Sequence, residues 1–291
     1  MRLTVLGSGP AAPQPDSPAS GLLVESGTTA ILLDCGQGVA GRLVRHLEPS
    51  RLTAVIIGHM HADHFVDLTA LRYRFDWGSR SNPRLPVLLP PGGRTRLEGL
   101  AGVISERPGF FDDAFEIHEY DPSSTERIGE LVVTYVPGRH YVPAWGVDIH
   151  APDASRLIYV GDTGPNPDLA ERARNADLMV CEATLGSVDE DDPDARGHLT
   201  LDEALAHGRS SGAVEMLITH YPSARRDAMN ARLTGLGGTV ALARPGLRIE
   251  VGAASRFADV QAAGGPRLTL DPSRIVSRGV GPMVGRERTA G

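Results

Sequence analysis

Three histidines and one aspartate fall within six residues of this chain, directly after an apolar run. The run, residues 52–57, predicts a buried strand, so His59, His61, Asp63 and His64 are expected on the loop that leaves it. Imidazole nitrogens and carboxylate oxygens together suit zinc, manganese or iron, whereas calcium prefers oxygen ligands alone. The segment therefore predicts a metal site that needs further ligands from elsewhere in the chain.

The order of these residues, H-x-H-x-D-H after a strand, resembles the signature of the metallo-β-lactamase superfamily. Members of that family add a lone histidine, then an aspartate after a strand, then a histidine after another strand. Candidates for all three follow in the same order: His140, Asp162 and His220. The resemblance spans residues 1–251 and implies a four-layer αββα sandwich, in which two mixed sheets pack face to face with helices outside.

The same resemblance divides the ligands between two divalent metal ions. It assigns His59, His61 and His140 to one ion and Asp63, His64 and His220 to the other, with Asp162 as the bridge between them. Zinc is the first expectation, with manganese or iron as alternatives, because nitrogen and oxygen ligands accept all three. Two such ions about 3.5–4 Å apart can hold a hydroxide between them. Asp63 is also a candidate catalytic residue, because its carboxylate is placed to orient that hydroxide.

His198 is the candidate for protonating the leaving group. It occurs in Gly-His-Leu-Thr, residues 197–200, which resembles the place of a histidine near the scissile bond in ribonuclease Z-like phosphodiesterases. An imidazole that protonates a departing alkoxide contributes about 10²–10⁴-fold in rate. The alternative is a histidine at a helix N-terminus that bonds to the backbone. We favour catalysis because the rest of the motif set is present, and we expect Thr200 to be the helix N-cap.

Asp34 follows a predicted strand over residues 30–33 and has two candidate roles. In the family an aspartate here orients a metal ligand, and the alternative is a helix N-cap, which aspartate also favours. The remaining histidines are expected in structural or solvent-exposed places: His46 in the last turn of a helix over residues 39–46, His118 and His150 on strands, and His207 on a helix surface.

Several segments resemble the ribonuclease Z branch of the family, namely residues 137–146, 161–164, 181–184 and 197–200. Lactonases and thioester hydrolases of the superfamily often continue the motif with a glycine pair, whereas this chain continues with Phe-Val-Asp. The layout near residues 15–21 looks like a short bacterial branch that includes cyclic-nucleotide phosphodiesterases. We therefore expect a hydrolase that cleaves a phosphodiester bond in a small or cyclic nucleotide.

Three alternatives stay open. One is a carboxylic ester, lactone or thioester hydrolase on the same two ions, another is an RNA-processing nuclease of ribonuclease Z type, and the third is a metal-dependent binding protein without catalysis. Transfer RNA is disfavoured, because the long RNA-gripping arm of such nucleases is replaced by a short connection between His140 and Asp162. A net charge of −7 and a pI near 5.8 also give no general basic field for a polyanion. The absence of lysine excludes Schiff-base chemistry.

With 291 residues, 41% of them hydrophobic, the chain is long enough for one large domain. The predicted ligands run from His59 to His220 and must lie in one body, which predicts a hydrolase domain over residues 1–255. Residues 256–291 are rich in glycine and arginine and predict an extension, either extended or packed at the interface of an expected homodimer.

Residues 1–7 are followed too soon by glycine and proline for a signal peptide, and no apolar run approaches the length of a membrane span. The two cysteines, Cys35 and Cys181, each follow an apolar strand-like run, so buried thiols are expected rather than a disulfide. These observations predict a cytoplasmic protein.

Overall fold

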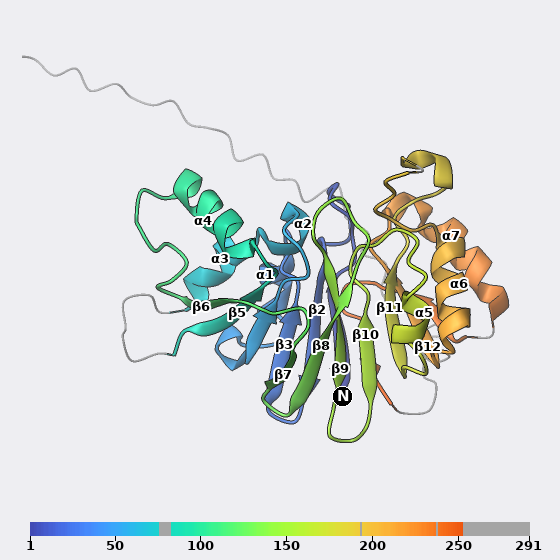
Figure 1. Cartoon of the computed structure of the whole chain (residues 1–291), viewed down its shortest axis with the longest axis horizontal. Coiled ribbons are helices and arrows are strands. Elements are labelled where there is room, and N and C mark those ends of the chain that lie inside the picture. Colours follow the sequence, from blue (N-terminus) through green and yellow to red (C-terminus); the bar gives the residue numbers. More distant parts are fainter. Residues whose placement is uncertain (76–82, 193, 237, 253–291) are drawn as a thin grey trace, which may run out of the picture.

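The computed structural model describes residues 1–75, 83–192, 194–236 and 238–252. Within these ranges two seven-stranded sheets pack face to face, and helices cover the outer face of each (Figure 1). This is the αββα sandwich expected from the sequence. The predicted extension over residues 256–291 lies outside the described residues, so a domain boundary at residue 255 stays a prediction.

The first sheet has the strand order β14-β1-β2-β3-β4-β5-β6. Strands β14, β1, β2 and β3 pair antiparallel, whereas β3, β4, β5 and β6 pair parallel. The bounds are β1 Arg2–Gly7, β2 Gly21–Ser26, β3 Thr29–Leu33, β4 Ala54–Ile56, β5 Leu85–Leu89, β6 Phe115–Glu119 and β14 Arg248–Glu250.

The second sheet has the order β13-β12-β11-β10-β9-β8-β7 and repeats the same division. Strands β10 to β13 pair parallel, and β7 to β10 pair antiparallel. The bounds are β7 Thr125–Ile128, β8 Leu131–Pro137, β9 Trp145–His150, β10 Arg156–Tyr159, β11 Leu178–Glu182, β12 Glu215–Thr219 and β13 Val240–Leu242.

Helices α1 to α4 flank the first sheet, and α5 to α7 flank the second (Figure 1). Their bounds are α1 Val39–Leu43, α2 Ala62–Phe65, α3 Leu68–Leu71, α4 Gly93–Ile104, α5 Leu169–Arg172, α6 Leu201–Ser211 and α7 Arg226–Leu233. Short 3₁₀ turns occupy Pro49–Arg51, Arg72–Arg74, Val188–Glu190, Ser223–Arg225 and Thr234–Leu236. Among the described residues no helix combines the length and the apolar character that crossing a membrane requires.

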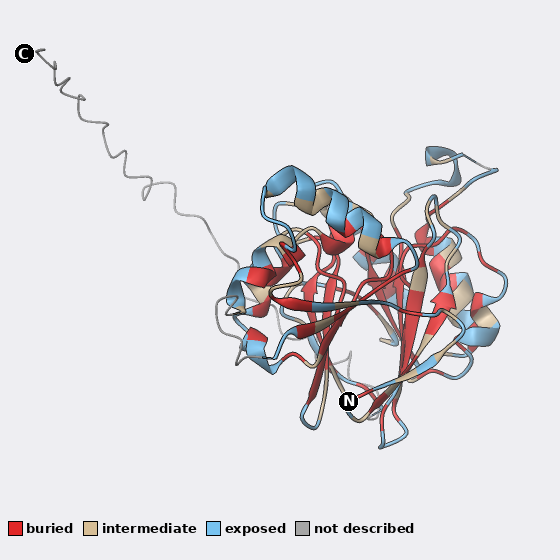
Figure 2. Ribbon diagram, turned by 60° about the vertical axis from the view of Figure 1, so that its left-hand side comes forward, coloured by how far each residue is buried: buried red, intermediate tan, exposed pale blue. Residues whose placement is uncertain are grey.

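The central strands are buried on both faces, as the red strands of Figure 2 show. In β3, Ile31 and Leu33 point into the core between the sheets, whereas Leu32 packs under the helices of the first sheet. In β10, Leu157 faces the central core and Ile158 faces the helices of the second sheet. Successive side chains of a strand point to opposite faces, so a strand covered on both faces reads as a continuous apolar run.

The strand directions bring the predicted ligands to one edge of the sandwich. Strands β3 and β4 are parallel, and β8, β10, β11 and β12 share one direction in the second sheet, since β8 and β10 both pair antiparallel with β9. The carboxyl ends therefore lie at one edge of each sheet, and the donor atoms that follow them come together there. The segments that carry the predicted ligands leave from these ends.

The structure corrects several local predictions. Helix α1 ends at Leu43, so the prediction that His46 lies in its last turn is wrong. Instead His46 accepts a hydrogen bond from Arg248, and burial together with the Arg248 charge lowers the pKa of this histidine. The sequence pattern also does not predict β7, because only Ile128 of its four residues is buried.

Candidate metal centre

All seven predicted ligands lie together at the edge where the parallel strands end. The donor atoms form two groups, and within each group they lie no more than 4.8 Å apart: His59, His61 and His140 in one, and Asp63, His64, Asp162 and His220 in the other. Not all of the first segment is a loop, because α2 begins after His61 and contains Asp63 and His64. A four-residue helix is too short to appear in a periodicity pattern.

The first group consists of three imidazoles whose ring nitrogens converge on one point. Nδ1 of His61 lies 3.1 Å from Nε2 of His59 and 2.9 Å from Nε2 of His140. Burial lowers the pKa of all three imidazoles, most strongly that of the buried His59. A neutral imidazole has the free lone pair that a metal ion needs, so the surroundings favour the ligand form of this group.

The second group is arranged around Asp162. Oδ2 of Asp162 lies 3.3 Å from Nε2 of His64, 3.4 Å from Nε2 of His220 and 3.8 Å from Nε2 of His59. Asp63 completes the group, with its Oδ2 3.1 Å from Nε2 of His220. One oxygen of Asp162 therefore faces both groups, as a bridging ligand must.

The Nδ1 atoms of three of these histidines are held by acceptors behind the centre. Nδ1 of His64 donates to Oδ2 of Asp34 at 2.8 Å, and Nδ1 of His140 donates to the carbonyl oxygen of Gly197 at 2.8 Å. Nδ1 of His220 lies 2.8 Å from the hydroxyl of Thr184. Such partners fix the tautomer that leaves the Nε2 lone pair free to bind a metal. Asp34 thus holds the ring of His64 in place, as expected. The alternative that Asp34 caps a helix is wrong, since α1 begins after Gly38.

The chemistry of the donor set fits two cations. Nε2 of His64 and Oδ1 of Asp162 are buried polar atoms without a hydrogen-bond partner. Burial opposes ionisation of Asp162, but the neighbouring imidazoles of His220 and His64 outweigh burial and hold the pKa of Asp162 well below its ordinary range. Unpartnered buried polar atoms are costly in a folded chain. Cations bound between the two groups would satisfy both atoms.

Glycine at position 36 allows the loop after β3 to approach α2 closely. A Cβ on Gly36 would lie 1.9 Å from the backbone oxygen of Asp63, so any larger residue would displace α2. The neighbouring N–H of Cys35 donates to the backbone oxygen of His64 at 2.6 Å. Cys35 and Cys181 are both free and buried, as expected.

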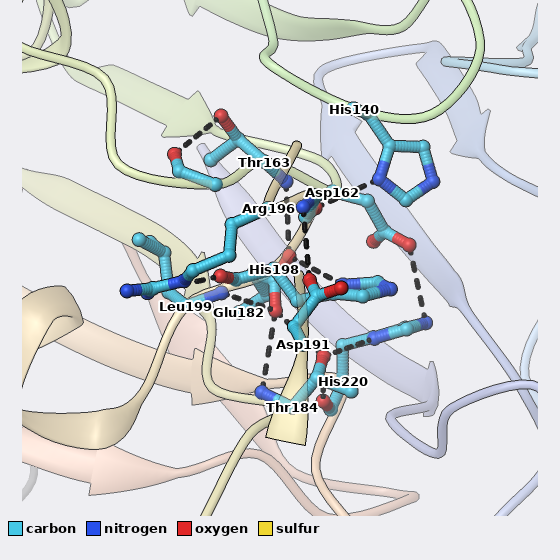
Figure 3. A network of polar contacts seen from close by, with 12 residues as sticks. His140, Asp162, Thr163, Glu182, Thr184, Asp191, Arg196, His198, Leu199 and His220 are labelled. Carbon is cyan, nitrogen blue, oxygen red and sulfur yellow. Dashed lines mark hydrogen bonds and ion pairs between the residues drawn. The ribbon is translucent and has the colours of Figure 1, made fainter. Parts of the chain in front are cut away.

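His198 lies beside the centre but makes its main hydrogen bond with a residue that the sequence analysis did not assign (Figure 3). Its Nδ1 donates to Oε1 of the buried Glu182 at 2.8 Å. Burial lowers the pKa of His198, but Glu182 outweighs burial and raises it to about 9. The His198 ring centroid lies 4.9 Å from that of His140 and 5.5 Å from that of His220. The alternative, in which the His198 side chain bonds to the backbone at the helix N-terminus, is therefore wrong, because Nδ1 bonds to the Glu182 side chain.

Glu182 is fixed by its own set of donors (Figure 3). The N–H groups of Thr163 and Leu199 and the hydroxyl of Thr184 donate to its carboxylate, at 2.9, 3.3 and 2.6 Å. The available signal in the sequence is an acid at the end of a predicted strand, a position that Asp162 shares. Sequence alone does not show which strand-end acid faces the metals and which faces His198.

The remaining histidines lie away from the centre. His118 and His150 are exposed and pair with neighbouring acids on their own strands, Glu116 and Asp148. His207 is half-buried on α6, and burial lowers its pKa. It is thus less exposed than the surface position expected.

Comparison with known proteins agrees with this geometry. The family model described as "Beta-lactamase superfamily domain" matches residues 29–221. The uncharacterized protein Rv1339 of Mycobacterium tuberculosis (strain H37Rv) is 33% identical over 253 residues, covering 82% of this chain and 88% of that protein. A ribonuclease Z of Ignicoccus hospitalis is 25% identical over 283 residues, covering 78% of this chain and 89% of that protein.

The probable metallo-hydrolase YhfI of Bacillus subtilis is 26% identical over 229 residues, covering 76% of this chain and 87% of YhfI. Its crystal structure superposes with a TM-score of 0.73 and 25% identity, over 85% of this chain and 98% of that one. A diphosphatase of the PhnP family has a TM-score of 0.71 at 20% identity, over 86% of this chain and 97% of that one. It supports the fold alone. The match over most of the chain, the sandwich and the histidine and aspartate cluster lead to one conclusion: this chain belongs to the beta-lactamase superfamily and is a metal-dependent hydrolase.

Proposed function

We propose that this hydrolase cleaves a phosphodiester bond in a small or cyclic nucleotide. In the proposal His59, His61 and His140 hold one divalent ion, Asp63, His64 and His220 hold a second, and Asp162 bridges them. The ions, zinc first among the candidates, would supply an activated water and positive charge opposite the developing negative charge on the phosphate. The ribonuclease Z relatives support this reaction class. The free thiols Cys35 and Cys181 support a reducing compartment such as the cytoplasm.

The observation that carries the proposal is the pair formed by His198 and Glu182. The Glu182 carboxylate holds Nδ1 of His198 and favours the protonated imidazole. The ligand-capable atoms of His198, His140 and Asp162 lie within 4.8 Å of one another. In the proposal Nε2 of His198, the nitrogen that Glu182 does not hold, gives a proton to the oxygen that leaves the phosphate. An alkoxide leaving group needs that proton, since an alkoxide is a strong base.

The test compares two phosphodiesters that differ in their need for a proton. With zinc- or manganese-loaded protein, we expect His198→Ala to lower turnover of a cyclic nucleotide, whose leaving group is an alkoxide, by about 10²–10⁴-fold. Turnover of bis(p-nitrophenyl) phosphate should fall much less, because nitrophenolate leaves without protonation. Metal content, measured by mass spectrometry, should stay unchanged. His207→Ala is the matched control and should leave both rates unaltered.

Two outcomes would contradict the proposal. Turnover of p-nitrophenyl acetate or a lactone without any phosphodiester turnover would assign the centre to carboxylic esters. An equal loss of turnover on both phosphodiesters would show that His198 is not the proton donor. Asp162→Ala distinguishes turnover at the metal centre from the activity of contaminating enzymes. It removes the proposed bridge and should abolish every metal-dependent rate.

A further inference from the structure

Tyr141 is an aromatic side chain that lies beside the candidate metal centre without a part in the chemistry described above. Its ring centroid lies 4.8 Å from that of His140 and 5.6 Å from that of His198. The residue is nevertheless 50% exposed. A large apolar ring left in water next to a reaction centre is a candidate contact for a ligand.

The Tyr141 ring is held in one position from two sides. Its hydroxyl donates to Oδ2 of Asp191 at 2.5 Å, and the same oxygen accepts from the N–H of Gly197 at 3.0 Å. The ring also packs directly on Gly197, where a Cβ would lie 2.6 Å from the ring carbon Cζ. A ring fixed in this way loses little conformational freedom when a ligand binds to it.

The same ring lines an open cavity of about 640 Å³ that includes His140, one of the proposed metal ligands. The cavity therefore adjoins the metal centre. Arg139 and Asp194 also line it, and they offer hydrogen-bond donors and acceptors respectively. A planar group with donors and acceptors along its edge matches these walls, and a nucleobase is such a group.

We propose that Tyr141 is a stacking platform for the nucleobase of a nucleotide whose phosphate lies at the metal centre. The inference rests on the proposed phosphodiesterase function and adds to it the residue that would bind the base and so favour a nucleoside phosphodiester over an alkyl one. Stacking of a base on an aromatic side chain contributes about 5- to 150-fold in affinity and tolerates any base. Arg139 and Asp194 would then select among bases through hydrogen bonds to the edge of the base.

An equilibrium measurement tests the platform without turnover. Isothermal titration calorimetry on zinc-loaded protein compares adenosine 5′-monophosphate with ribose 5-phosphate, which has the sugar and the phosphate but no base. We expect Tyr141→Leu to weaken the nucleotide by about 5- to 150-fold and to leave ribose 5-phosphate within about twofold. Tyr141→Phe should keep most of the nucleotide affinity. Tyr73→Leu, at another exposed tyrosine, is the matched control and should change neither.

A kinetic measurement separates stacking from a structural role. The p-nitrophenyl ester of thymidine 5′-monophosphate and methyl p-nitrophenyl phosphate share a leaving group and differ in the nucleoside. Tyr141→Leu should raise KM for the thymidine ester alone. Equal changes for both esters, or wild-type protein that binds nucleotide and ribose phosphate equally, would overturn the platform. Tyrosine-dependent nucleotide binding without turnover of either ester would support the platform and refute the proposed function.

Discussion

Asp34 supports the metal centre from a backbone conformation that non-glycine residues seldom adopt, with φ of 57°. Its Oδ2 accepts from His64 and from the hydroxyl of Tyr159, both at 2.8 Å, and its Oδ1 accepts from the N–H of Gly58 at 2.9 Å. Asp34 follows β3 of the first sheet and Tyr159 ends β10 of the second. One carboxylate therefore joins both sheets directly behind a proposed ligand, which offsets the backbone strain.

This arrangement predicts that Asp34→Ala lowers zinc affinity by about 10- to 100-fold, because His64 loses the acceptor that fixes its tautomer and orientation. Competition with a chromogenic chelator would measure the affinity. Tyr159→Phe removes one hydrogen bond to Asp34 but leaves the His64 contact, so it should keep the affinity within a few-fold. A folded Asp34→Ala protein that binds zinc as tightly as the wild type would refute the role.

Helix α6 begins next to His198, and its first turn has a complete capping box. The hydroxyl of Thr200 accepts from the N–H of Glu203 at 3.4 Å, and the Glu203 carboxylate accepts from the N–H of Thr200 at 2.9 Å. The N-cap expected from the sequence is thus confirmed. The cap satisfies two backbone donors that a helix start would otherwise leave unpaired.

Loss of this cap should destabilise the fold measurably. We expect Thr200→Ala to lower the free energy of unfolding by about 1 kcal/mol, measured by urea denaturation. Ser187→Ala is a matched control, since Ser187 stands at the start of a 3₁₀ turn without a capping hydrogen bond. It should change stability by less than about 0.5 kcal/mol. Equal effects of the two substitutions would contradict the capping argument.

The elements that the sequence predicts are those with a local cause. Apolar runs predict the buried strands, and the family resemblance predicts Asp162 and His220, which follow such strands, at the site. The sequence pattern cannot predict that His198 bonds to Glu182. The two residues meet only in the folded chain, where a β-bridge between Leu185 and Thr200 brings their segments together. Local pattern together with the family resemblance therefore predicts the proposed ligands, and tertiary packing selects the groups that orient them.

At the scale of the whole molecule, the centre depends on how the two halves of the sandwich meet. His59, His61, Asp63 and His64 follow β4 of the first sheet, and His140, Asp162 and His220 follow strands of the second. The glycine- and proline-rich loop after β1 crosses between the halves. Its Asp16 pairs with Arg226 at the start of α7 and accepts from the hydroxyl of Ser223 at 2.6 Å.

The Asp16 pair predicts a pH dependence of stability. The hydrogen bond from Arg226 is the largest influence on Asp16 and lowers its pKa. A lowered carboxyl pKa in the folded state stabilises the fold above the unfolded pKa, about 3.9, and that contribution is lost as pH falls through the folded pKa. Because the pair is partly exposed to water, its contribution at neutral pH should not exceed about 1 kcal/mol.

Urea unfolding of wild-type and Asp16→Asn protein at pH 6 and pH 3 measures this contribution, with chelator present so that metal binding does not change with pH. The wild type should be the more stable of the two at pH 6. The difference should shrink at pH 3, because the wild-type carboxyl is then partly protonated and resembles the amide. Asp227→Asn, one residue beyond Arg226 on α7, controls for a general change in charge. A difference that stays constant between the two pH values would mean that Asp16 acts through packing of the loop and not through its charge.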